Sequence, residues 1–434
     1  MEPRTKVLYL LQGHPALERG GPETYALELY EAMRASAEFE PMLVARMGSE
    51  ADLPRRHRVG TIFSSLSGDE NQYLALIEKA GFDFSYLTYG EKSLYVRYFA
   101  DFLIAHQPDV VHFQQPTLMG CELISLIRRL LPTVPIIYTL HDYAPICHRD
   151  GKLVRTRTEA LCLEASPRRC HECFLETPEE DFFLRQRFIQ AHFNHVDRFL
   201  APSHFLLERY VDWGIPREKI QFEDYGRPPA LPVPESDEAR PRTRLGYFGE
   251  LSPYKGIEVF LRAMRILLDE QPDIHLWLHG ANLDRYPEHE QQQFWSLLDG
   301  TRANVTFSGG YDRNSLPQLM SQIDWLVVPS RWWENSPLVI QEAFLYGRPV
   351  ICSGIGGMAE KVSSGVNGLH FTVSDPRNLA DNIRAAATTP GLWDELRSGI
   401  PPVYSMQEHV ESLSSLYREC LGPARRAEAS ALSE

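Results

Sequence analysis

Short runs of apolar and β-branched residues alternate with longer segments of helical length along most of the chain. In the first half, the apolar runs predict strands at residues 6–13, 41–47, 109–114, 135–142 and 198–202. Segments typical of helices lie between them, at residues 23–34, 92–106 and 118–131. Because strands separated by helices form βαβ units with parallel strands, we expect a parallel sheet covered by helices.

A proline-rich stretch interrupts this alternation, and the same pattern then starts again. Four prolines fall within the seven residues 228–234. Proline fixes φ and lacks a backbone N–H, so we predict a linker at residues 227–242. Strands are then predicted at residues 245–249, 275–280, 304–308, 325–329 and 349–353.

The repeated pattern predicts two doubly wound α/β domains, at residues 1–226 and 243–404, followed by a C-terminal helix and tail at residues 405–434. Within this last segment, residues 405–421 are expected to be helical and residues 422–434 to be frayed. A chain of 434 residues is too long for one ordinary hydrophobic core. Fold alone does not give function, so the chemistry must come from particular residues.

Composition narrows the class of protein. A hydrophobic content of 43% and a charged content of 24% are typical of soluble globular proteins. The formal net charge of −14 argues against broad nucleic-acid binding, which needs a basic face. No apolar stretch is long enough to span a bilayer, and the apolar run at residues 7–11 is too brief for a signal peptide. We therefore expect a cytoplasmic protein, in a compartment where disulfides are unfavourable.

Glu334 and Glu342 lie in one strand-to-helix segment, directly after the strand predicted at residues 325–329. Ser336 can cap the helix N-terminus, and Pro337 suits its first turn. Glu334 is then expected in the strand-to-helix loop and Glu342 nearly two turns into the helix. Two carboxylates beside a positive helix end suit a ligand with hydroxyls and phosphates. The plainer alternative is an amphipathic helix with one exposed glutamate and one that faces the cleft.

Lys255 follows a glycine turn after the first strand of the second domain. The stretch lacks the spacing of a Walker loop, which makes a P-loop NTPase an unfavourable interpretation. What remains is a lysine at a helix start, where backbone N–H groups and an ammonium can hold a diphosphate. The alternative is a solvated surface lysine.

Gly20 and Gly21 lie in the loop after the first strand, with His14 a few residues ahead of them. Paired glycines let the backbone approach a ligand closely, and Pro22 opens a helix whose dipole favours an anion. Most Gly-Gly turns are only turns, so this pattern is weak on its own.

His141 and Asp142 end the strand predicted at residues 135–142, at the edge of a parallel sheet where ligands collect. His141 is the preferred site histidine, and Asp142 either orients it or caps the following turn. His112, at the end of another strand, is a second candidate for the acceptor side, together with His14 and Asp142. A structural role is the alternative for an isolated strand histidine.

The residues from 333 to 371 include both glutamates and a later glycine turn at residues 354–357, and they resemble the family-4 retaining glycosyltransferases. The resemblance is dense over residues 244–372 and collinear over the first domain. It implies the GT-B architecture, in which two Rossmann-like domains face a cleft. It also implies transfer of a hexose from a nucleoside-diphosphate sugar to a hydroxyl acceptor, with no catalytic metal. Bacterial-type polysaccharide or glycolipid assembly is the implied setting.

Individual roles follow from this resemblance. Glu334 contacts the donor hexose, Glu342 contacts the ribose, Lys255 contacts the diphosphate, and His141 lies near the reacting sugar. The further donor-side residues are Gly20, Gly21, Asn335, Ser336, Leu338 and Val339. Where the family often has an arginine beside the diphosphate, this chain has Glu250, and we consider Arg331 as its replacement.

Four cysteines fall within one predicted insertion, at residues 144–178. They are Cys147, Cys162, Cys170 and Cys173. The two-residue spacing of the last pair is typical of a metal chelate, and neighbouring arginines favour thiolates. We therefore expect a structural zinc ion, with free buried cysteines as the alternative. The same basic stretch is a candidate contact for anionic lipid or a lipid-linked acceptor at the inner face of the plasma membrane.

Two other functions stay open. One is a nucleotide-sugar epimerase on the same architecture, which would form its product without an acceptor. The other is a non-catalytic module whose zinc-stapled loop binds a partner, and Glu250 in the diphosphate site favours it. The sequence does not predict the donor nucleotide, the sugar, the acceptor or the linkage. It does not predict the oligomeric state either.

Overall fold

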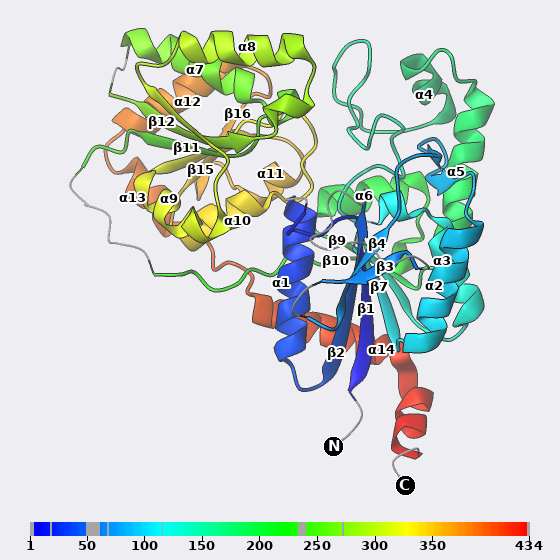
Figure 1. Ribbon diagram of the computed structural model, residues 1–434. Helices are drawn as coiled ribbons and strands as arrows, with labels where there is room; N and C mark the ends of the chain where they lie inside the picture. The colour runs from blue at the N-terminus through cyan, green and yellow to red at the C-terminus, as the bar shows by residue number, and fades with distance from the viewer. Residues whose placement is uncertain are drawn as a thin grey trace. The chain divides into compact units, whose positions relative to one another are not determined.

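A computed structural model describes residues 4–17, 20–48, 61–66, 69–114, 116–232, 240–270 and 273–431. The chain divides into two compact units (Figure 1). Unit 1 comprises residues 1–226 together with 406–434, and unit 2 comprises residues 227–405. Within the predicted linker, residues 233–239 lie outside the described residues.

Unit 1 is built on an eight-stranded sheet with the order β10-β9-β8-β7-β1-β2-β4-β3 in the part of the chain that the structure describes. Its pairs are parallel except for the antiparallel pair β3–β4. The strands are β1 (Thr5–Leu11), β2 (Phe39–Met47), β3 (Phe63–Ser65), β4 (Gln72–Leu76), β7 (Val110–Gln114), β8 (Ile136–Thr139), β9 (Arg198–Ala201) and β10 (Ile220–Phe222). A separate hairpin joins β5 (Phe82–Asp83) to β6 (Thr88–Tyr89).

The helices of unit 1 connect these strands, and one of them comes from the C-terminal end of the chain. They are α1 (Gly21–Ala35), α2 (Ser93–His106), α3 (Glu122–Leu130), α4 (Pro167–Cys173), α5 (Glu179–Phe193), α6 (His204–Trp213) and α14 (Met406–Ala431). The predicted cysteine insertion consists mainly of turns, with the bridge Val154↔Leu161 and the short helix α4.

Unit 2 contains a six-stranded parallel sheet, again within the described residues, with the order β13-β12-β11-β14-β15-β16. Its strands are β11 (Arg244–Glu250), β12 (His275–Ala281), β13 (Val305–Gly309), β14 (Trp325–Val328), β15 (Val350–Ser353) and β16 (Gly368–Phe371). Its helices are α7 (Ile257–Glu270), α8 (Glu288–Asp299), α9 (Leu316–Gln322), α10 (Leu338–Leu345), α11 (Gly356–Lys361), α12 (Pro376–Thr388) and α13 (Leu392–Ser398).

The prediction of an α/β fold with parallel sheets is confirmed for both halves of the chain. The strands that the sequence did not reveal are short and lie mostly toward the ends of their sheets, among them β3, β10 and β16. Short strands carry too few apolar residues to give a clear pattern. Among the described residues, no helix has both the length and the apolar character needed to cross a membrane.

Helix α14 belongs to unit 1, although it follows unit 2 in the sequence. The Tyr417 hydroxyl lies 3.1 Å from the Tyr9 hydroxyl and 2.7 Å from Nδ1 of His112 on β7. Earlier in the same helix, His409 contacts the Tyr25 hydroxyl through Nε2 and Glu223 through Nδ1. The helix breaks at Gly422, where φ is 65°, and then continues to Ala431, where the sequence predicted a frayed end.

Tyr417 gives the fold a first test, because its ring and hydroxyl are buried against unit 1. We expect Tyr417→Phe to lower the free energy of unfolding by about 1–3 kcal/mol, since it removes a hydrogen-bond partner from buried His112. Tyr73→Phe is the matched control, because no hydrogen bond to the Tyr73 hydroxyl is seen from the described residues. Chemical denaturation of both variants decides the matter, and equal losses would contradict a specific role for the Tyr417 hydroxyl.

Candidate functional site

Glu334 and Glu342 lie where the sequence predicted, in the loop after β14 and in the second turn of α10. The details of the helix start differ from the prediction. Pro337 is the N-cap residue, and α10 has no side-chain cap, so Ser336 does not cap it. Ser336 is instead buried in the loop, and Leu338 and Val339 form the first positions of the helix.

Glu334 is buried and held by three donors on a single oxygen. Its Oε1 accepts hydrogen bonds from Lys255 Nζ at 2.7 Å, from Ser330 Oγ at 2.7 Å and from Trp332 Nε1 at 2.8 Å. Burial acts to raise the pKa of Glu334, but the Lys255 ammonium and these hydrogen bonds outweigh it, so the pKa lies below its usual value. Within the described part of the chain, no hydrogen bond reaches Oε2.

Glu342 is also held through Oε1, but by arginines. Arg227 contacts this oxygen at 2.9 Å and Arg313 at 3.1 Å. The Arg227 side chain is buried, whereas that of Arg313 is 41% exposed. As with Glu334, Oε2 takes no hydrogen bond from the described residues, and it is therefore the oxygen through which a hydroxyl-bearing ligand can bind.

Two glycines shape the loops that carry these groups. A Cβ atom on Gly256, next to Lys255, would lie 1.8 Å from the Pro329 carbonyl oxygen at the end of β14. A Cβ atom on Gly357 would lie 1.6 Å from the Asn335 carbonyl oxygen, and the Gly357 N–H donates to the Glu334 carbonyl at 2.9 Å. Only glycine permits these close approaches, which place the Lys255 turn and the α11 turn against the glutamate loop.

The structure shows where the remaining donor-side candidates lie, and their roles in donor binding stay predictions. Arg331 donates from Nε to Ser374 Oγ at 3.2 Å, so its guanidinium already has a partner. The Asn335 side chain accepts from the Ser336 N–H at 2.7 Å, which makes it a loop-forming group. Glu250 is the last residue of β11, and its role beside a diphosphate stays a prediction.

The Gly20-Gly21 turn opens α1 as predicted, with Gly20 as N-cap residue and a proline in the first turn. An anion site is less open there than the sequence indicated. A Cβ atom built on Gly20 would meet Glu23 Oε2 at 2.2 Å, so a carboxylate of the same helix already lies beside this turn.

His141 is buried just after β8, with both ring nitrogens engaged. Its Nε2 lies 2.8 Å from Gln114 Oε1, and its Nδ1 lies 2.5 Å from the Tyr225 hydroxyl. An amide oxygen only accepts, so Nε2 carries the proton and Nδ1 accepts from Tyr225. Burial lowers the pKa of His141 to about 3, which keeps the ring neutral at physiological pH. His141 is thus an oriented neutral group, and acting as a base would require breaking the Tyr225 bond.

The other acceptor-side candidates are internal. His112 is fully buried, and its ring bonds to Tyr417, Thr139 and Gln114 inside unit 1, which fits the structural role considered as its alternative. A place on the acceptor side stays a prediction. His14 is also buried, between Gln72 and its own loop.

Asp142 caps the following turn by accepting from the Ala144 N–H at 2.8 Å, which is one of the two roles considered for it. Gln114 and Tyr225 contact the two ring nitrogens of His141, and a part for Asp142 in orienting His141 stays a prediction.

The expected zinc site is not found. Among the described residues, which include Cys147, Cys162, Cys170 and Cys173, no group of three or more His, Cys, Asp or Glu could hold a metal ion. Burial raises the pKa of the Cys147 thiol and that of Cys170, the latter to about 12, so these groups stay protonated thiols.

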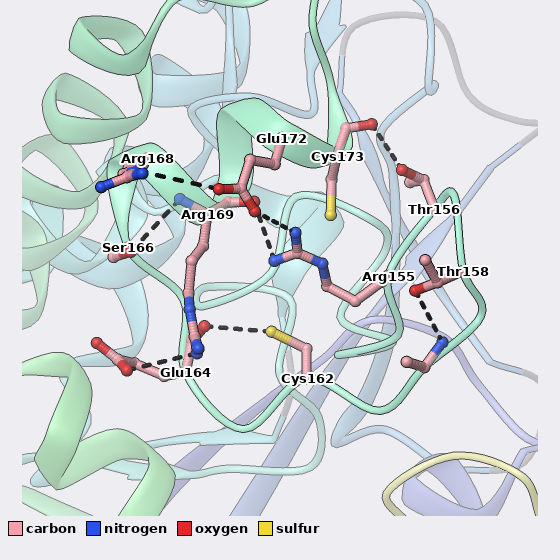
Figure 2. A network of polar contacts seen from close by, with 11 residues as sticks. Arg155, Thr156, Thr158, Cys162, Glu164, Ser166, Arg168, Arg169, Glu172 and Cys173 are labelled. Carbon is pink, nitrogen blue, oxygen red and sulfur yellow. Dashed lines mark hydrogen bonds and ion pairs between the residues drawn. The ribbon is translucent and has the colours of Figure 1, made fainter.

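Ion pairs and hydrogen bonds hold the cysteine segment together instead (Figure 2). Arg155 donates to Glu172 at 2.5 Å and to the Arg169 carbonyl at 3.4 Å. Cys162 points toward the Glu164 carbonyl at 3.1 Å, and Thr156 donates to the Cys173 carbonyl at 2.7 Å. Three of the arginines near the cysteines pair with glutamates, namely Arg155, Arg168 and Arg169.

Sequence reasoning missed several groups that hold the site, above all Arg227, Arg313, Ser330, Trp332 and Gln114. Ser330 and Trp332 lie within four residues of Glu334, so the tight turn between strand and helix was an available signal. Arg227 was assigned to the linker because prolines follow it, yet it is buried against Glu342.

Both halves of the chain are similar to known glycosyltransferases. A model described as Glycosyltransferase Family 4 matches residues 19–222, and one described as Glycosyl transferases group 1 matches residues 242–389. A D-inositol 3-phosphate glycosyltransferase of Acidothermus cellulolyticus is 27% identical over 251 residues, 54% of this chain and 55% of the relative. The chain spans about half the length of the curated relatives it matches.

Solved structures with the same fold cover nearly the whole chain. Sucrose-phosphate synthase from Thermosynechococcus elongatus superposes with a TM-score of 0.67 at 18% identity, over 96% of this chain and 99% of that one. HepE from Anabaena, in complex with UDP, gives a TM-score of 0.63 at 17% identity, over 95% and 99% of the two chains. The fold is GT-B, and with both of its domains matched, the chain belongs to the family-4, group 1 glycosyltransferases.

Proposed function

We propose that this protein is a retaining glycosyltransferase that moves a hexose from a nucleoside-diphosphate sugar to a hydroxyl acceptor. One observation carries the proposal. Two buried carboxylates, Glu334 and Glu342, are each fixed through Oε1 by cationic partners, while Oε2 takes no hydrogen bond from the described residues. Such oxygens suit sugar and ribose hydroxyls, which need an acceptor held in a fixed position.

The proposed roles follow the positions of the groups. Glu342 accepts from the ribose, Glu334 accepts from hexose hydroxyls, and Lys255, 2.7 Å from Glu334, interacts with the diphosphate. In the transfer step, the bond between the anomeric carbon and the diphosphate oxygen breaks, and the acceptor oxygen bonds to the same face of that carbon. The acceptor proton passes to the departing phosphate. Lys255 stabilises the charge that develops on this phosphate.

The relatives favour particular donors and acceptors. HepE structures are described in complex with UDP and with UDP-glucose, which makes a uridine diphosphate sugar our proposed donor. Other similar proteins are named as a D-inositol 3-phosphate glycosyltransferase and a sucrose-phosphate synthase. For this chain we propose a glycan or glycolipid hydroxyl as acceptor, on the family resemblance. The epimerase alternative has no observation in its favour.

Glu342→Ala tests the donor site directly. We expect wild-type protein to bind one nucleoside diphosphate selectively in a calorimetric panel of UDP, GDP and ADP, and Glu342→Ala to bind it at least about tenfold more weakly, because the ribose loses its acceptor. Glu288→Ala, an exposed glutamate on α8 of the same unit, is the control and should keep wild-type affinity. A folded wild-type protein that binds no member of the panel would overturn the proposal.

Lys255→Met tests the diphosphate contact and the charge on Glu334. We expect UDP affinity to fall about tenfold or more, since a charge-assisted hydrogen bond is lost. Loss of the ammonium also raises the pKa of Glu334 from its lowered value, so UDP-glucose binding should weaken at a higher pH than in wild type as the pH falls from 7.5 to 5.

Arg331→Met is the comparison for the same experiment. A similar loss of affinity in this variant would show that Arg331 serves as the second diphosphate cation. Unchanged affinity and an unchanged acid limb in Lys255→Met would contradict the assigned role of Lys255.

A further inference from the structure

Tyr225, Gly226 and Arg227 are consecutive residues at the point where the chain passes from unit 1 to unit 2. A connection between two units needs only a flexible backbone. Because prolines follow Arg227, the sequence predicted a linker that begins at this residue. Both polar side chains of this segment are nevertheless buried, with Tyr225 4% exposed and Arg227 3% exposed. Burial of a phenol and a guanidinium requires hydrogen-bond partners, and these partners are informative.

Tyr225 makes its contacts within unit 1. Its hydroxyl donates to Nδ1 of His141 at 2.5 Å, and its ring stacks on the imidazole with a centroid distance of 5.3 Å. Tyr25, on α1, is a second aromatic neighbour of Tyr225, with a distance of 4.4 Å between the two ring centroids. The phenol therefore has little freedom to move, and together with Gln114 it decides which nitrogen of His141 carries the proton.

Arg227 makes its contacts within unit 2. Its guanidinium bonds to Glu342 Oε1 at 2.9 Å, and its backbone N–H donates to the Tyr404 carbonyl at 2.9 Å. A bridge to Ser405 adds to this backbone support. Arg313, the other cation on Glu342, is exposed and so can move aside for a ligand. Arg227 is the fixed partner of the pair, and it determines where the carboxylate lies.

We propose that Tyr225 and Arg227 are positioning residues for the transfer reaction, one orienting His141 and the other orienting Glu342. This inference rests on the proposed function, because it takes Glu342 as the ribose contact. Neither residue touches substrate in the proposal; each acts through the residue that it holds. A segment of three residues thus supports one site group in each unit, with Gly226 as the single residue between the two anchors.

Arg227→Gln tests the unit 2 half. We expect UDP affinity, measured on variant protein whose circular dichroism shows it folded, to fall at least about tenfold because Glu342 loses its fixed partner. Arg227→Lys should recover part of the loss because it restores a cation beside Glu342. Arg384→Gln is the matched control, since Arg384 pairs with carboxylates on the surface of unit 2 and should leave UDP affinity unchanged. Wild-type UDP affinity in Arg227→Gln would overturn this half.

Tyr225→Phe tests the unit 1 half by a spectroscopic readout. In histidine-labelled protein we expect the ¹⁵N signals of His141, assigned with His141→Asn, to show a protonated Nε2 and a hydrogen-bonded Nδ1. In Tyr225→Phe the Nδ1 signal should move toward that of a free imine nitrogen, whereas Tyr73→Phe should leave it unchanged. An unchanged His141 signal in Tyr225→Phe would overturn this half.

The two measurements separate the inference from the proposed function. If wild-type protein binds none of the nucleoside diphosphates, the proposed function fails and the Arg227 assignment fails with it. The His141 spectrum needs no nucleotide and decides the Tyr225 assignment in either case.

Discussion

A buried carboxylate is tolerated only where cations and hydrogen-bond donors replace the water that it loses. The candidate donor site depends on this compensation. Lys255 supplies it for Glu334, and Arg227 supplies it for Glu342. The close backbone contacts at Gly256 and Gly357 matter because they bring the loops near enough for these bonds to form. Without the compensating groups, neither carboxylate would stay charged in its place.

In unit 1, two buried histidines are held by hydrogen bonds between neutral groups. His112 and His141 are buried, and burial lowers the pKa of both, so their rings are neutral partners in a hydrogen-bonded chain that includes Gln114 and Tyr417. Neutral networks need each donor to meet an acceptor, which fixes orientation rather than charge. The groups that the proposed reaction uses therefore lie in different environments, which are ionic around Glu334 and Glu342 and neutral around His141.

Local patterns predicted the parts of the molecule that depend on neighbouring residues. The alternation of strands and helices, the loop position of Glu334 and the helical position of Glu342 all follow from stretches of about twenty residues. Long-range partners could not be predicted in this way. Nothing near Arg227 in the sequence indicates Glu342, which is 115 residues away, and nothing near Tyr417 indicates His112, which is 305 residues away.

The cysteine segment shows the opposite error, in which a local pattern had no structural counterpart. The spacing of Cys170 and Cys173 fits a metal chelate, but a metal site also needs further ligands brought together by the fold. Arg155 and Glu172 hold that region through an ion pair, and charge pairing of this kind leaves no distinctive spacing in a sequence.

The membership of α14 in unit 1 has a consequence for synthesis of the chain on the ribosome. All of unit 2 is made before α14 emerges, so unit 2 is complete while unit 1 still lacks a helix. Until then, the buried groups that bond to Tyr417 and His409, among them His112 and Glu223, have no partner from that helix. Unit 1 therefore lacks one of its helices until the whole of unit 2 has been synthesised.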